Sequence, residues 1–275
     1  MLNKAEFVKL MQKKAEEYGE VEIQTVSRVN LDYLGMYVKR NNVPTPVINL
    51  DAFYDHYCET GNDPESYFEY IDEALNMHRN FNFDPHRISD WDWAKDKLYF
   101  RLLGNVVNGI CIPVADMYLV PYLYITEDDS ATVRITTELI DAWGVTTDDV
   151  FAQAKENQSI IRPFTIDNMS DVLGCDIDIP LYVVTTENHT YGAAAILYPG
   201  VAEQVREIVG EDFYLLPSSV HEMLALPKSM AGSMMGLTRV VVEANRTAVA
   251  EDDQLSDSVY VYDFVANTLK KVSPD

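Results

Sequence analysis

The sequence predicts an α+β protein with mixed helices and mainly antiparallel sheets, arranged as two α+β regions. Apolar residues recur at helical spacing in some segments and alternate with polar residues in others along the 275 residues. The apolar fraction of 47% is typical of a packed globular protein, and a chain of this length buries a sizeable core. Residues 81–96 are irregular, polar and aromatic around Asp84-Pro85. We therefore place a boundary between residues 1–90 and residues 91–275.

The N-terminal region is expected to combine three helices with three strands. Its first helix has an apolar stripe that includes Phe7 and Met11, and Gly19 follows as a stop signal. Its strands alternate apolar and polar residues, with a turn at Asn41-Asn42 before the last strand. The expected elements are helices at 3–18, 51–61 and 63–80, two strands within 20–40, and a strand at 46–50.

The C-terminal region is expected to contain short strands and helices. Apolar runs on both sides of Glu127-Asp128-Asp129 predict one hairpin, and runs at 181–186 and 192–198 predict another. Ser218 or Ser219 precedes an apolar run, which predicts the cap of a helix through residue 226. The other expected elements are strands at 98–103 and 213–216, helices at 137–143, 147–157, 168–173, 200–209 and 233–247, and a hairpin made by 259–264 and 268–272.

The composition excludes two classes of partner and indicates a cellular compartment. Forty-four acidic and 21 basic residues give a net charge of −23. Nucleic acids and anionic membranes both need clustered Lys and Arg, so we expect no direct nucleic-acid or membrane partner. The first residues form a charged amphipathic segment instead of an apolar leader. The separated cysteines Cys58, Cys111 and Cys175 are typical of free thiols, so we expect a cytoplasmic protein.

The sharpest local candidate for a site is the string Leu-Pro-Ser-Ser-Val-His-Glu at 216–222. At a helix start, His221 would act as a base or ligand beside free backbone N–H groups, assisted by Glu222. The alternative interpretation is structural. Ser219 and Glu222 have the spacing of a capping box, which needs no further partner, and this spacing favours the structural interpretation.

Fingerprints of metal and cofactor sites are missing from the sequence. The five histidines are scattered, with no pair at a ligand spacing, so we predict no metal and no cofactor. Nucleophile-elbow, phosphate-loop and dinucleotide-binding patterns are absent. The acidic runs at 127–129 and 251–253 lack the spaced ligands and the glycine of an EF-hand, which is typical of solvated loops.

Several strings in the chain resemble, as an ordered set, an uncharacterised bacterial family known only as a domain of unknown function. They are Trp-Gly-Val at 143–145, Leu-Tyr-Pro-Gly at 197–200, the string at 216–222, Val-Glu-Ala-Asn at 242–245 and Leu-Ser-Asp-Ser-Val-Tyr at 255–260. The resemblance covers most of the chain and implies a cytoplasmic bacterial protein, with no activity to carry over. The family pattern has a Pro-His pair where this chain has Pro113-Val114, which disfavours a metal or His-pair site.

Two functional hypotheses from different classes follow. The preferred one is a non-enzymatic binding or accessory protein that contacts a protein partner, because the chain is acidic and catalytic fingerprints are absent. A nucleic-acid mimic is a minor form of this hypothesis, since the acids are spread along the chain. The alternative is a hydrolase that uses His221 and Glu222 as catalytic residues. The candidate ligand-binding residues are Ser218, Ser219, Glu243, Asn245 and Asp257.

Overall fold

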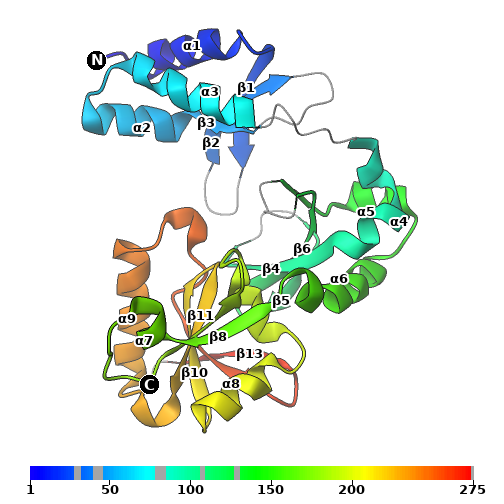
Figure 1. Ribbon diagram of the computed structural model, residues 1–275, viewed down its shortest axis with the longest axis vertical. Helices are drawn as coiled ribbons and strands as arrows, with labels where there is room; N and C mark the ends of the chain where they lie inside the picture. The colour runs from blue at the N-terminus through cyan, green and yellow to red at the C-terminus, as the bar shows by residue number, and fades with distance from the viewer. Residues whose placement is uncertain (28–31, 40–45, 78–84, 106–108, 127–130, 274–275) are drawn as a thin grey trace. The chain divides into compact units, whose positions relative to one another are not determined.

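The computed structural model describes residues 1–27, 32–39, 46–77, 85–105, 109–126 and 131–273 (Figure 1). The chain divides into two compact units, Met1–Arg87 and Ile88–Asp275. Helices and antiparallel sheets occur in both units, which confirms the α+β prediction. The predicted turn at Asn41-Asn42 and the acidic run at 127–129 lie outside the described residues. Within the described ranges, no helix has the length and apolar character needed to cross a bilayer.

The first unit packs helices against a three-stranded antiparallel sheet of order β1-β2-β3. Val21 lies opposite Val38 and Ile23 opposite Met36, so one face of the sheet is apolar. Phe7 on the first helix packs among the rings of three tyrosines at the centre of this core. The elements are α1 (Lys4–Ala15), β1 (Glu20–Ser27), β2 (Asp32–Lys39), β3 (Ile48–Asn49), α2 (Leu50–Thr60), the 3-10 turn η1 (Pro64–Ser66) and α3 (Tyr67–Met77).

The second unit opens with a small antiparallel sheet of order β4-β6-β5, in which β7 also pairs with β6. Leu98 and Phe100 on β4 face the helices, where they pack with Trp143 and Val150. The opposite face of β4 is directed towards η4. The elements are η2 (Pro85–Ser89), α4 (Trp91–Ala94), η3 (Lys95–Lys97), β4 (Leu98–Leu103), β5 (Ile112–Val114), β6 (Met117–Tyr124), β7 (Thr132–Arg134), α5 (Thr137–Trp143) and α6 (Thr147–Ile161).

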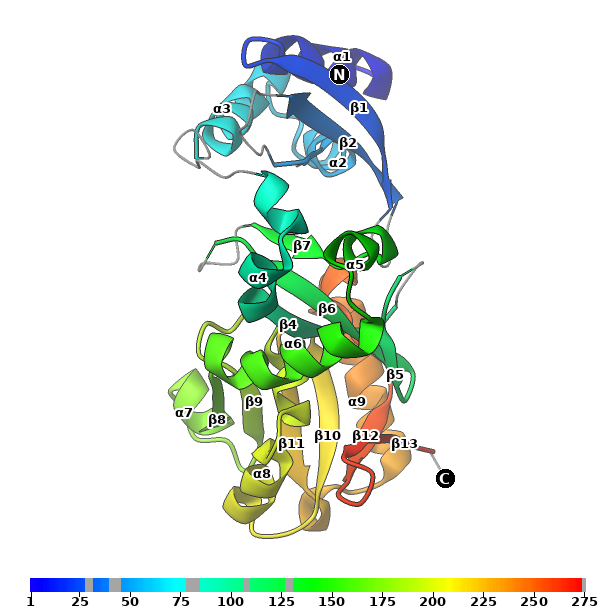
Figure 2. The ribbon, with the colours of Figure 1, turned by 90° about the vertical axis from the view of Figure 1, so that its right-hand side faces the viewer.

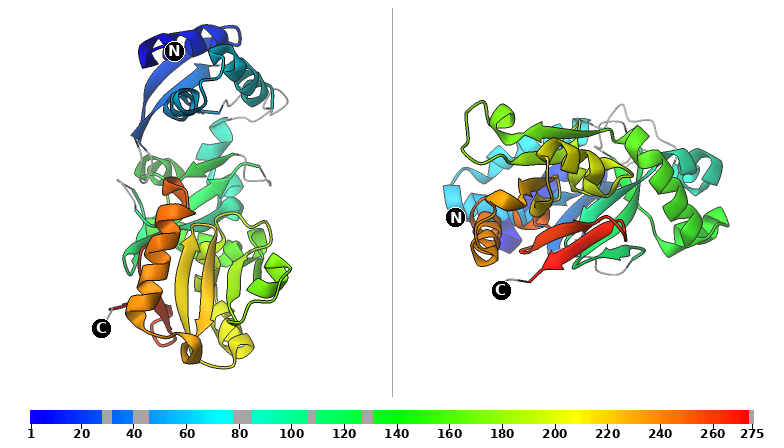
Figure 3. Two further views of the ribbon diagram at one scale, coloured as in Figure 1. Left: turned by 90° about the vertical axis from the view of Figure 1, so that its left-hand side faces the viewer. Right: turned by 90° about the horizontal axis from the view of Figure 1, so that it is seen from below.

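A larger sheet follows, with the order β13-β12-β10-β11-β9-β8. Helix α9 packs on one face of this sheet, against β10 and β12, while α8 and η4 lie on the other face (Figures 2 and 3). The elements are β8 (Phe164–Asn168), α7 (Met169–Leu173), β9 (Tyr182–Thr186), η4 (Gly192–Leu197), α8 (Val201–Val209), β10 (Phe213–Ser219), β11 (Glu222–Pro227), η5 (Lys228–Met230), α9 (Met234–Thr247), η6 (Glu251–Asp253), β12 (Val259–Asp263) and β13 (Thr268–Val272).

Two sequence predictions about this sheet are wrong. Residues 216–222 do not begin a helix. They end β10, turn, and enter β11, with Leu216 opposite Leu224 and Ser219 opposite Glu222. The apolar residues on both sides of the Ser-Ser pair fill central strands, and this pairing overrides the local capping signal. Residues 192–197 form a buried 3-10 segment, η4, and not the second strand of a hairpin.

Candidate functional site

Residues 218–222, which we call the His221 turn, join β10 to β11. Ser219 Oγ accepts a hydrogen bond from the backbone N–H of His221 at 3.1 Å. Ser218 Oγ donates to Glu222 Oε1 at 2.8 Å. Both predicted ligand-binding hydroxyls and the predicted catalytic carboxylate are therefore bonded within the hairpin itself.

The imidazole of His221 has a defined environment on both ring nitrogens. The backbone N–H of Tyr191 donates to Nδ1 at 3.1 Å, and Nε2 lies 3.4 Å from Asp253 Oδ1. Because Nδ1 accepts this hydrogen bond, the neutral ring holds its proton on Nε2, which faces a carboxylate. In the described part of the chain, neither nitrogen is bonded to a hydroxyl or thiol.

The backbone of the His221 turn is fixed by neighbouring segments. Val220 donates to the carbonyl of Asp253 at 2.8 Å, and the hydroxyl of Thr185 donates to the carbonyl of His221 at 2.7 Å. Gly192 lies so close that an added Cβ would be 2.7 Å from the His221 carbonyl oxygen and 2.5 Å from a backbone nitrogen. A glycine is therefore required where η4 passes the turn.

A buried arginine, Arg101, also contacts the ring of Tyr191. The Arg101 guanidinium lies 3.6 Å from the centre of the Tyr191 ring and 4.2 Å from the centre of the Tyr122 ring. Arg101 also donates to the hydroxyl of Tyr99 at 2.8 Å, and the Tyr191 ring lies 5.3 Å from the His221 ring. These contacts hold Tyr191 in a left-handed conformation with φ of 51°. Sequence reasoning missed Arg101, although one charge inside the apolar run at 98–103 was a usable signal.

The structure brings together two of the three candidate residues from the last two motif strings. Asn245 on α9 is buried and donates to Asp257 Oδ1 at 2.7 Å and to the carbonyl of Ser256 at 3.0 Å. This pair joins α9 to the segment before β12. Glu243 lies on the exposed side of the same helix, where it pairs with Arg246 at 2.7 Å, so it does not join them.

Another polar cluster, absent from our sequence predictions, joins the two sheets of the second unit. The buried hydroxyl of Tyr260 donates to Asp116, and Lys271 Nζ lies 2.9 Å from the same carboxylate. Burial favours a raised pKa for the Asp116 carboxyl, but the hydrogen bonds from Tyr260 and Lys271 outweigh burial and hold that pKa below its usual value. Burial and the bond to Asp116 raise the pKa of the Tyr260 phenol. The cluster is a structural cross-link.

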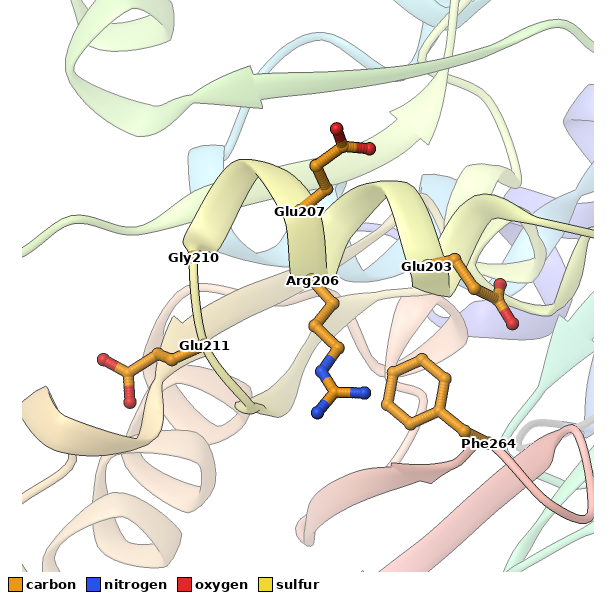
Figure 4. A pocket seen from close by; sticks show the side chains of 6 residues that line it. All are labelled: Glu203, Arg206, Glu207, Gly210, Glu211 and Phe264. Carbon is orange, nitrogen blue, oxygen red and sulfur yellow. The ribbon is translucent and has the colours of Figure 1, made fainter.

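A depression beside α8, of about 530 Å³, contains three glutamates (Figure 4). Arg206 extends beside the ring of Phe264, 5.0 Å from its centre, and binds Asp212 at 3.0 Å. The glutamate carboxylates point away from one another in Figure 4, so they offer no common point for a cation. Across the described ranges, no three His, Cys, Asp or Glu side chains are grouped so that they could hold a metal ion. The lining residues are Glu203, Arg206, Glu207, Gly210, Glu211 and Phe264.

Helix α9 exposes large apolar side chains on both flanks of its outward side, with Met235 and Val242 on one flank and Val240 on the other. Met235 is 66% exposed, Val240 60% and Val242 40%, whereas Val241 and Asn245 are buried beneath the helix. The segment 227–250 contains one acidic residue and three basic residues, the reverse of the balance of 44 acids to 21 bases in the whole chain. We call this surface the α9 outer face; it consists of Met235, Arg239, Val240, Val242, Glu243 and Arg246. Sequence reasoning placed the helix but did not identify this face.

Comparison with known proteins identifies a family but no characterised relative. No curated protein and no solved structure matches the chain. A family model described as a family of unknown function, DUF5688, matches residues 3–264, which include strands and helices of both units. This match confirms the resemblance stated from the motif strings, and it carries no activity. The chain therefore belongs to DUF5688, a family of unknown function.

Proposed function

We propose that this protein is a non-enzymatic accessory protein of the bacterial cytoplasm that binds a protein partner through the α9 outer face. The observation that supports the proposal is the exposure of Met235, Val240 and Val242 on a helix that has one acidic residue. Protein interfaces are enriched in Met and Arg and depleted in Asp and Glu. Covering this apolar surface would contribute about 25 cal/mol per Å² buried.

The geometry favours binding over the hydrolase alternative. A hydrolase centred on His221 needs a ring nitrogen that is free to accept a proton from a nucleophile or water. Nδ1 accepts the Tyr191 N–H, Nε2 faces Asp253, and Glu222 accepts the Ser218 hydroxyl. The predicted catalytic residues therefore act as internal cross-links, and this supports a surface away from the turn as the functional one.

Site-specific photo-crosslinking in the native bacterium tests the proposal. A photoreactive phenylalanine analogue at position 240 is expected to give one discrete adduct with another protein. The same analogue at position 265 is the matched control, because Val265 is 95% exposed and lies outside α9. We expect no such adduct from position 265.

Charge substitutions on the same helix separate specific binding from non-specific adhesion. Val242→Glu is expected to remove the adduct from position 240 while leaving the thermal melting temperature unchanged, because the residue is exposed. Val265→Glu is the control and should leave the adduct in place. Adducts of equal yield from positions 240 and 265, or an adduct only with a second copy of this chain, would contradict the proposal.

A further inference from the structure

The two edge strands of the six-stranded sheet differ in how well their side chains prevent pairing with a strand of another chain. β13 presents exposed Lys270 and Lys271, and lysines on an edge strand discourage pairing with another chain. β8 reads Phe-Thr-Ile-Asp-Asn and has no lysine, arginine or proline. Figure 2 shows β8 at the margin of the sheet, next to α7. One edge of the sheet therefore carries two lysines, and the other is open in the sense that no described strand pairs with it.

The hydrogen bonds to β9 show which backbone groups of β8 point outward. Glu187 donates to the carbonyl of Pro163 at 2.9 Å, and Met169 donates to the carbonyl of Leu181 at 2.8 Å. In an antiparallel pair such bonds recur at every second residue, so residues 163, 165, 167 and 169 bond to β9. In the described part of the chain, no strand pairs with the other side of β8. Phe164 and Ile166 therefore have outward backbone N–H and C=O groups, and Asn168 has an outward N–H, because its C=O as the N-cap of α7 accepts the first bond of that helix.

The residues around β8 define the chemistry of a complementary segment. Exposed apolar side chains occur just before the strand, in α7 after it, and before β9. They are Ile160, Val172, Leu173 and Ile179. The same stretch, 160–179, contains four aspartates, and its one basic residue, Arg162, is buried. The complementary segment is therefore extended, apolar and basic.

We propose that the open edge of β8 binds an extended segment of a partner protein as an additional strand, and that this segment alternates apolar and basic residues. Backbone hydrogen bonds supply the affinity in this mode of recognition, and alternate side chains supply the specificity. A second copy of this chain is disfavoured as the occupant, because two β8 edges would bring the aspartates of both copies together. The inference rests on observations separate from the α9 outer face.

Synthetic peptides test the proposal on the full chain. The probe is a capped seven-residue peptide that alternates Val and Lys. The comparison peptides are the Val-Glu analogue and the Val-Lys peptide N-methylated on the backbone nitrogens of one edge. We expect the Val-Lys peptide to bind at least about tenfold more tightly than either comparison peptide, as measured by fluorescence anisotropy. Bound peptide should also slow amide exchange at Ile166 and Asn168, while Lys270 and Lys271 keep their exchange rates.

Variants of β8 provide a second readout. Ile166→Pro removes one outward N–H without removing a bond to β9, and it should weaken Val-Lys binding about tenfold, whereas Ile166→Val should preserve it. If Ile166→Pro does not fold, the double change Asp167→Lys and Asp171→Lys should invert the preference between the Val-Lys and Val-Glu peptides. Val242→Glu on α9 should leave peptide binding unchanged.

Three outcomes would overturn the proposal. The first is equal binding of the N-methylated and parent peptides, which would indicate attraction by charge alone. The second is exchange protection confined to residues outside β8. The third is protection of Ile166 and Asn168 in the absence of peptide, together with a dimer in sedimentation, which would identify a second copy of the chain as the occupant.

Discussion

The His221 turn and the α9 outer face differ in whether their side chains contact other groups of the chain or are exposed to solvent. In the turn, Ser218, Ser219, Glu222 and both nitrogens of His221 contact other groups of the same chain. On the α9 outer face, large apolar side chains are exposed. The first region therefore holds the second unit together, and the second leaves free energy of burial to be gained on contact with a partner.

This difference gives each region its own pattern of mutational effects. Substitutions in the turn are expected to lower the free energy of unfolding and to leave partner binding intact in molecules that remain folded. Substitutions on the α9 outer face are expected to do the reverse. Tryptophan fluorescence measures the stability of the second unit specifically, because Trp91, Trp93 and Trp143 all lie there.

The largest effect is expected for Gly192→Ala. The new methyl group would lie 2.5 Å from the backbone nitrogen of Thr186 and 2.7 Å from the His221 carbonyl oxygen, and neither backbone atom can move freely. We expect a loss of about 3 kcal/mol in the free energy of unfolding, measured by urea titration. Gly236→Ala, the same change on α9, is the control and should change stability by less than about 1 kcal/mol, because its Cβ would meet only the Ser233 Oγ, at 3.1 Å, and alanine favours a helix. Equal effects of the two changes would contradict this account of the turn.

The next largest loss of stability is expected on the buried side of α9, and the exposed side of the same helix provides the comparison. Asn245→Ala removes hydrogen bonds to the Asp257 carboxylate and to the Ser256 carbonyl, so a loss of about 2 kcal/mol is expected. Glu243→Ala removes only an exposed ion pair with Arg246 and should change stability by less than about 0.5 kcal/mol. Urea titration of both variants measures the contrast. A larger effect of Glu243→Ala would show that the exposed side of the helix is structural.

Three segments of the second unit show how much of the fold the sequence alone predicts. The helix expected at 233–247 is observed as Met234–Thr247, because its period and its Ser233 cap are local signals. The hairpin expected at 259–264 and 268–272 is observed as β12 and β13 for the same reason. The string at 216–222 also contains a local capping signal, but pairing with strands distant in sequence decides its structure.

Contacts between distant segments explain the residues that sequence reasoning missed. Arg101 and Tyr191 meet only after the small sheet packs against η4, and Asp116 meets Tyr260 only after the two sheets join. Asn245 and Asp257 lie in neighbouring motif strings and were grouped as candidate ligand-binding residues, but the bond between them was not predicted. The α9 outer face has no motif of its own, because exposed apolar residues are recognised only once the buried side of a helix is known.

A smaller effect is expected at His221 itself. His221→Ala removes the acceptor of the Tyr191 N–H and the contact with Asp253, and should cost about 1 kcal/mol. His221→Asn places an amide oxygen near the position of Nδ1 and should restore part of this loss. Both variants should keep the photo-crosslink from position 240. If His221→Ala removes that crosslink without lowering stability, the turn belongs to the binding site and the comparison fails.

The smallest effect is expected at the Asp116 cluster, where the carboxylate is partly exposed to water. Hydrogen bonds from Tyr260 and Lys271 hold the pKa of Asp116 below that of an unfolded aspartate, which is about 3.9. The ionised carboxylate therefore stabilises the fold above about pH 4, and this contribution is lost as the pH falls through the lower folded-state pKa.

The variant Asp116→Asn lacks this stabilising contribution at every pH. The stability difference between wild type and variant should be constant above about pH 5, remain below about 1 kcal/mol, and shrink below about pH 4. A difference that persists unchanged to pH 3 in urea titrations would mean that the cluster acts through the packing of Tyr260 and not through the charge of Asp116.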